Sequence, residues 1–126
     1  MSSGEVRLAV PAQPGYLRMT RLLAAGVASR VGFTLDEVDD LRIAIDEVCF
    51  ALVGPNGRDG TISVRYQLID DGLVVEGEGH FADRGHDTPL LSPLSMQILG
   101  AVADECSLEA GVDGPTFRLV KRRKRE

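Results

Sequence analysis

The stretch Val38-Asp39-Asp40-Leu41-Arg42-Ile43-Ala44-Ile45-Asp46-Glu47-Val48-Cys49 decides the fold, because it has the pattern of an amphipathic helix. Its apolar residues recur at spacings of three and four, which places them on one side of a helix. Thr34 and Glu37 have the spacing of a capping box, so the helix is expected to begin there. Gly54-Pro55 is expected to end it. The side facing the core is predicted to hold Val38, Leu41, Ala44, Ile45, Val48, Cys49 and Leu52.

The segments around this helix predict an α+β fold. Tyr16–Val31 also has helical spacing, and Gly32 is placed to cap its C-terminus. Asp70-Asp71-Gly72 is typical of a hairpin turn. The other expected elements are a helix over Pro93–Asp104 and strands over Val6–Val10, Thr61–Ile69, Leu73–Glu76, Glu105–Glu109 and Thr116–Lys121.

Two adjacent helices precede the hairpin, so the element order excludes a βαβ alternation. It predicts a two-layer sandwich, with a mixed, largely antiparallel sheet and about three helices on one face. Gly77–Leu91 is expected to be loose, because it contains three glycines and Pro89. In the last helix, the residues expected to face inward are Leu94, Ile98, Leu99 and Val102.

Length and composition indicate one cytoplasmic domain over residues 1–126. The 126 residues are 44% apolar and 26% charged, which is ordinary for a globular protein. No apolar run approaches the ~18 residues of a membrane span, and the first residues lack the basic and apolar parts of a signal peptide. Cys49 and Cys106 are expected to be buried free thiols in a reducing compartment.

The net charge of −5 is unevenly distributed. Five of the 14 basic residues lie in Lys121–Arg125, at the start of a short basic tail over residues 121–126. The preceding 120 residues contain nine basic and 18 acidic residues. A body this acidic argues against direct nucleic-acid binding and suits a partner with basic surfaces. The tail is expected to be solvated, with partner binding as the alternative.

The helix quoted first resembles the anti-sigma serine kinases of the RsbW and SpoIIAB type, which have the Bergerat (GHKL, histidine-kinase-like) ATPase fold. The resemblance covers about residues 6 to 121. It is most specific in the acidic start of the helix and in the Ala44–Cys49 core. It implies that ATP lies between the helices and a lid, with Glu47 as general base, a role that a carboxylate can perform. The alternative for Glu47 is an exposed or structural carboxylate.

The chain departs from the family at the magnesium position. The family has an Asn one turn after the Glu, where this chain has Ala51, which offers no ligating oxygen. Asp46 and Asn56 are the substitutes in principle. However, Asp46 lies about 100° around the helix from Glu47, and Asn56 follows the helix end.

The adenine segment of the family is Asp-x-Gly-x-Gly, and two registers are open here. In one, Glu76 replaces the Asp, Glu78 the first Gly and His80 the second. In the other, Gly77 and Gly79 fill the glycine positions but Val75 replaces the Asp.

The phosphate turn of the family is glycine-rich, whereas Leu91–Met96 has no glycine. Ser92 is the residue there that is able to contact a phosphate, with a helix N-cap as the alternative. Ala82–Leu90 is short for a lid. His80 and His86 are expected to be loop histidines, and no metal site is predicted.

These departures favour an anti-sigma factor that acts by protein binding. Such a protein sequesters an alternative sigma factor and is released by an anti-sigma antagonist of the STAS type. The resemblance also implies a homodimer, with sigma contacting the first helix, where Tyr16, Arg18 and Arg21 are the candidates. Their alternative is plain solvation. Two other hypotheses are an active ATP- and magnesium-dependent serine kinase that phosphorylates its antagonist, and a non-catalytic dimeric adaptor.

Overall fold

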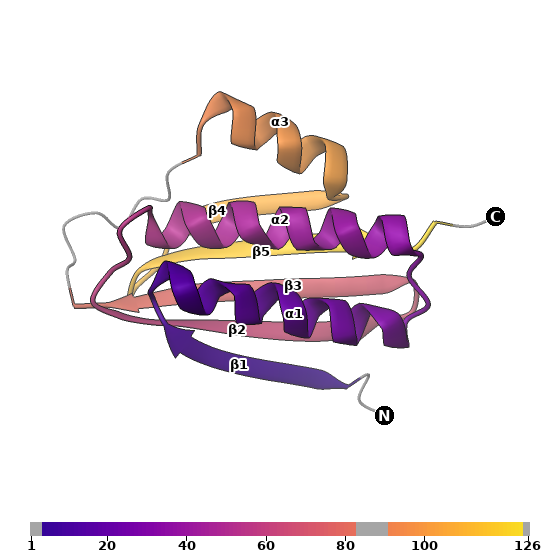
Figure 1. The fold of residues 1–126 in the computed structure, drawn as a ribbon, viewed down its shortest axis with the longest axis horizontal. Coiled ribbons are helices and arrows are strands. Elements are labelled where there is room, and N and C mark those ends of the chain that lie inside the picture. Colours follow the sequence, from indigo (N-terminus) through magenta and orange to yellow (C-terminus); the bar gives the residue numbers. More distant parts are fainter. Residues whose placement is uncertain (1–3, 83–90, 125–126) are drawn as a thin grey trace.

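The computed structural model describes residues 4–82 and 91–124, which form a helical layer on a five-stranded sheet. The strands have the order β1-β2-β3-β5-β4, and all four pairings are antiparallel. All three helices cover the same face of the sheet (Figure 1). The elements are β1 (Glu5–Pro11), α1 (Pro14–Arg30), α2 (Leu35–Val53), β2 (Gly60–Ile69), β3 (Gly72–Phe81), α3 (Pro93–Val102), β4 (Glu105–Ala110) and β5 (Pro115–Arg122).

This architecture confirms the predicted α+β sandwich of the Bergerat type. The sheet is antiparallel at every described pairing, where a mixed sheet was expected. Among the described helices, none is long and apolar enough to cross a membrane.

Helix α2 begins and ends as its sequence predicts. The Thr34 hydroxyl accepts a hydrogen bond from the Glu37 amide at 3.2 Å, and the Glu37 carboxylate accepts one from the Thr34 amide at 2.8 Å. Each side chain thereby satisfies an amide that the helix leaves unpaired. The predicted stripe is buried except for Val38, which is partly buried. Gly54 ends the helix with a φ of 82°.

Helix α1 ends in a left-handed residue, as predicted for Gly32. Its φ is 78°, a conformation that glycine adopts without steric cost. The Phe33 amide reaches back to the Ala28 carbonyl at 3.4 Å, which is the bond of a Schellman motif. The two helices are therefore joined by a short turn, whose backbone conformation is set by Gly32 and by this hydrogen bond.

Strand β3 is longer than the sequence predicted. Its second half, Gly77–Phe81, was expected to be loose but pairs with β2 along its whole length. The glycines are tolerated there because aromatic rings pack over them: a Cβ on Gly77 would overlap the Phe117 ring, and one on Gly79 the Phe81 ring. The rest of the expected loose segment, residues 83–90, lies outside the described residues.

Helix α3 covers the β4 side of the sheet and buries less than predicted. Leu99 is buried, and Ile98 and Val102 are partly buried. The prediction that Leu94 faces inward is wrong, because its side chain is 65% exposed. α3 lies over the end of the sheet beside α2, so only one of its sides meets the core (Figure 1).

The prediction of a solvated tail is wrong for Lys121 but holds for the exposed side chains of Arg122, Arg123 and Lys124. Lys121 is buried beside Asp40 of α2, with Nζ 3.4 Å from Oδ2. Arg123 donates to the Val31 carbonyl, and the Lys124 amide donates to the Glu37 carboxylate, each at 2.6 Å. Hydrogen bonds therefore attach the start of the tail to the α1–α2 turn. Residues 125 and 126 lie outside the described part of the chain.

Both cysteines are free, as predicted. Cys49 is completely buried, whereas Cys106 is only partly buried.

Candidate functional site

Helix α2 carries Glu47 half-buried, about 100° around the helix from Asp46. Asp46 faces α1, where it pairs with Arg21 at 3.0 Å, so it is not oriented with Glu47 toward a common ligand. One turn after Glu47, Ala51 is buried at 5% exposure and presents only a methyl group. Glu47 alone of these positions therefore offers a carboxylate in the predicted place.

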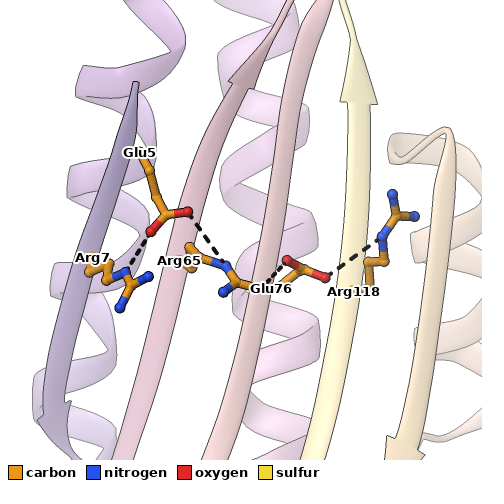
Figure 2. Close-up of polar contacts among 5 residues, drawn as sticks. All are labelled: Glu5, Arg7, Arg65, Glu76 and Arg118. Atoms are coloured by element: carbon orange, nitrogen blue, oxygen red, sulfur yellow. Dashed lines mark hydrogen bonds and ion pairs between the residues drawn. The ribbon is translucent and has the colours of Figure 1, made fainter. Parts of the chain in front are cut away.

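Glu76 and Glu78 lie on the opposite side of the sheet from Glu47. Figure 2 shows Glu76 between Arg65 and Arg118 on the face that no helix covers. Its carboxylate is 2.6 Å from Arg65 and 3.8 Å from Arg118. This contact raises the pKa of the Arg65 guanidinium. The structure therefore does not bring these two predicted cofactor residues together with Glu47.

The charges around Glu76 form a ladder across the open face. Glu5 pairs with Arg7 on β1 and approaches Arg65 on β2 at 4.0 Å (Figure 2). Beyond the residues drawn there, Arg118 on β5 reaches Glu105 on β4 at 3.4 Å. An antiparallel sheet commonly exposes one such polar face to water. Glu76 is therefore held by arginines of both neighbouring strands, whereas Glu78 lies outside the ladder and is 3.6 Å from His80.

The other register of the adenine segment lies on the same side as Glu47. Val75, Gly77 and Gly79 face the helices, because strand residues two apart share a face. However, the Phe117 and Phe81 rings already fill the space over the two glycines. Val75 is also buried and has no acceptor for an adenine amino group.

Ser92 is the N-cap of α3. Its hydroxyl accepts a hydrogen bond from the Ser95 amide at 3.0 Å, and Pro93 follows in the first turn. Its oxygen is thus already bonded to the helix end. Of the two histidines, His80 lies on β3 near Glu78 and Asp113, at 3.6 and 3.9 Å. His86, like the predicted lid, falls outside the described residues.

These residues do not fit a magnesium-bound triphosphate. Ala51 supplies no ligand, and residues 4–82 and 91–124 hold no group of three or more His, Cys, Asp or Glu side chains placed to bind a metal. The four predicted cofactor residues are divided between the two faces of the sheet and a helix cap. No step of a phosphate transfer follows from this arrangement.

Helix α1 presents an exposed apolar surface that the sequence prediction only partly found. Tyr16 is 48% exposed, and so is Met19, while Leu22 is 59% exposed. Arg18 is exposed beside them, but Arg21 is turned toward Asp46. The sequence prediction missed Met19 and Leu22. They lie on the side of α1 opposite its buried stripe, which includes Leu17, Thr20 and Ala24.

The fold and the position of Glu47 define a histidine-kinase-like sandwich of the Bergerat class. Comparison with known proteins narrows this class, although no family model matches the chain. The chain is 30% identical over 142 residues to the serine-protein kinase RsbW of Bacillus pumilus, covering 96% of this chain and 87% of that protein. It is 40% identical over 135 residues to RsbW of Bacillus velezensis, covering 92% and 84%. A shorter match, 40% over 83 residues, links it to RsbW of Bacillus subtilis.

The chain therefore belongs to the RsbW family, as the sequence of α2 predicted.

Proposed function

We propose that this chain is an anti-sigma factor that acts by protein binding rather than by phosphate transfer. It holds an alternative sigma factor away from RNA polymerase, and an anti-sigma antagonist of the STAS type competes for an overlapping surface and releases it. Family membership supports the partner class. The observation that supports this mode of action is the exposed apolar surface of α1. The residues at the family's nucleotide-binding positions, in contrast, differ from those of the family.

The proposed sigma surface consists of Tyr16, Arg18, Met19 and Leu22. Met19 and Leu22 point outward from α1, and Tyr16 and Arg18 flank them on either side. Exposed aromatic, Met and Arg side chains are common at protein interfaces. Arg21 is left out of this surface because its guanidinium is held by Asp46. We further propose that the chain acts as a homodimer, which rests on the family resemblance.

Replacing both Met19 and Leu22 with serine is expected to weaken sigma binding about 100-fold, because truncating central apolar side chains removes most of an interface's affinity. The sigma factor is first recovered from host lysate with the chain as bait, and affinity is then measured by titration. Leu35→Ser is the matched control, since Leu35 is 83% exposed at the start of α2, outside the proposed surface.

Unchanged affinity in the Met19/Leu22 variant would remove α1 from the proposal. A bait that recovers neither a sigma factor nor an antagonist would favour the non-catalytic adaptor instead.

Calorimetric titration with ATP and magnesium is expected to give no saturable heat at protein concentrations of about 100 μM, which detects Kd values up to the millimolar range. The reason is the buried methyl of Ala51 at the metal position and the Phe rings over Gly77 and Gly79. A saturable, magnesium-dependent heat would contradict this and favour the kinase. In that case Glu47→Ala is expected to abolish transfer to the antagonist while largely sparing ATP binding.

A further inference from the structure

Helix α2 exposes two large apolar side chains beside the proposed sigma surface of α1. Ile43 is 43% exposed and Phe50 is 52% exposed. They are seven residues apart, so they lie two turns apart on the side of α2 that faces away from its buried stripe. Neither side chain belongs to the hydrophobic core, so packing within the chain does not account for them.

Two contacts define how α1 and α2 lie side by side on the sheet (Figure 1). The Thr20 hydroxyl lies 3.8 Å from the Cys49 sulfur, and the Arg21 guanidinium lies 3.0 Å from the Asp46 carboxylate. The second contact lies further along α1 but earlier along α2, so the two helices are antiparallel. The Arg21–Asp46 ion pair therefore bridges the seam between them.

The exposed apolar side chains of the two helices are arranged around this ion pair. Met19 and Phe50 each adjoin a residue of the first contact in sequence, so they lie at one level of the helix pair. Leu22 adjoins the second contact, and Ile43 lies one turn of α2 beyond it. The ion pair thus lies between two levels, each with one exposed apolar side chain from each helix.

The α1 surface alone is too small for a specific partner. Its three apolar side chains are about half exposed, and together with Arg18 they offer roughly 400 Å², at about 200 Å² for a large side chain. A stable interface buries about 800 Å² on each partner. On the other side of α1, Val6 and Leu8 of β1 pack against the core. The exposed apolar side chains that adjoin the α1 surface are therefore those of α2.

The charges at the seam are paired within the chain. Arg21 is paired with Asp46, and the Arg42 guanidinium lies 3.7 Å from the Asp39 carboxylate. These two pairs have no net charge, which suits an apolar partner segment better than a strongly charged one.

We propose that Ile43 and Phe50 complete the sigma-binding surface, so that an apolar segment of the sigma factor lies across α1 and α2 and covers the Arg21–Asp46 pair. The partner is that of the proposed function, on which the inference rests. A segment that packs on the outer side of α1 also reaches α2, because the axes of packed helices are only about 8–10 Å apart.

Replacing both Ile43 and Phe50 with glutamine is expected to weaken sigma binding about 30-fold, measured by the same titration as for the α1 variant. Glutamine is a good helix former, so the Tm is expected to change by less than about 3 °C. Leu35→Gln combined with Val112→Gln is the matched control. These side chains are 83% and 87% exposed at the first residue of α2 and in the β4–β5 turn, and their loss is expected to leave the affinity unchanged.

The α1 and α2 variants together distinguish the shared surface from the proposed function. Weaker sigma binding by both supports a surface that spans the two helices. Weaker binding by only one of them would overturn the shared surface, and if that one is the α1 variant the proposed function stands. Unchanged binding by both would overturn the two together. An α2 variant that retains sigma but loses the antagonist, or that dissociates a dimer, would assign Ile43 and Phe50 to that other occupant and overturn the proposal.

The ion pair provides an independent test of whether the partner covers the seam. In the free chain the Arg21 and Asp46 side chains are 33% and 45% exposed, so Asp46→Ala is expected to change the Tm by less than about 3 °C. In the complex it leaves the Arg21 guanidinium covered without a counter-charge, and sigma binding is expected to weaken at least about tenfold. Adding Arg21→Met removes that charge but keeps the apolar stem, so it is expected to recover part of the affinity. Unchanged or tighter binding by Asp46→Ala, or no recovery on adding Arg21→Met, would contradict a partner over the seam.

Discussion

Replacing Glu37 with alanine is expected to lower the free energy of unfolding by about 2–4 kcal/mol, since hydrogen bonds to a buried charged group contribute more than neutral ones. The Glu37 side chain is 3% exposed and accepts hydrogen bonds from two amides, those of Thr34 and Lys124. Its loss removes the capping box of α2 and one attachment of the tail together. Urea unfolding of the two proteins measures the difference.

Asp36→Ala is the matched control for this variant. Asp36 is the neighbouring acidic residue of the same helical turn but is exposed. Its loss is expected to cost about 0.5 kcal/mol, from the helix dipole alone. Equal costs for the two variants would show that the Glu37 contacts add nothing beyond charge at the helix start.

The contribution of Glu37 also has a defined pH dependence. Burial alone would raise the pKa of its carboxyl, but the Thr34 and Lys124 hydrogen bonds and the Lys121 charge together lower it from 4.5. Because the folded state has the lower pKa, this stability is present above about pH 4.5 and is lost as the pH falls below it. The stability difference between the natural chain and Glu37→Gln is therefore expected to shrink from pH 7 to pH 3. A constant difference over that range would contradict the lowered pKa.

Gly77→Ala is expected to lower the free energy of unfolding by about 1–3 kcal/mol, because an added methyl overpacks a filled core. Its Cβ would overlap the Phe117 ring, which is itself buried at 3% exposure. Gly26→Ala, in open space on α1, is expected to have the opposite sign. Thermal unfolding compares the two.

A double-mutant cycle identifies the cause of the Gly77 effect. In the Phe117→Leu background the smaller side chain leaves room, so Gly77→Ala is expected to cost less than in the natural chain. Additive costs would show that the glycine is needed for a reason other than the ring above it. The same cycle separates a packing role of Gly77 from the nucleotide role that the family resemblance implies.

The parts of the fold that were predictable depend on residues close together in the chain. The capping box of Thr34 and Glu37 and the left-handed turn at Gly32 involve bonds within about five residues. The apolar residues of α2 recur every three or four residues, so helical spacing alone predicts that they share one face. The sequence of α2 also predicted the family, and the comparison with its relatives confirms that prediction.

The candidate site was only partly predictable, because side-chain direction depends on register. A one-residue change of register in β3 moves Glu76 from the helix side to the open face. The sequence left both alignments of the adenine segment open, and the pairing of β3 with β5, which sets Gly77 opposite Phe117, places Gly77 on the helix side and Glu76 on the open face. Ala51 and Glu47 were identifiable from sequence because they lie on one continuous helix.

By itself, then, the sequence determined the helices, their caps, the order of the elements and the family, since each follows from contacts within a few residues or from the pattern of a single segment. Only the tertiary structure decided that Arg123 and Lys124 form hydrogen bonds with Val31 and Glu37 at the α1–α2 turn. It also decided that aromatic rings fill the space over Gly77 and Gly79, and that Glu76 belongs to a surface charge ladder. These features join residues as far apart as Val31 and Arg123. Such contacts exist only after the sheet has formed, because pairing and packing bring distant residues together.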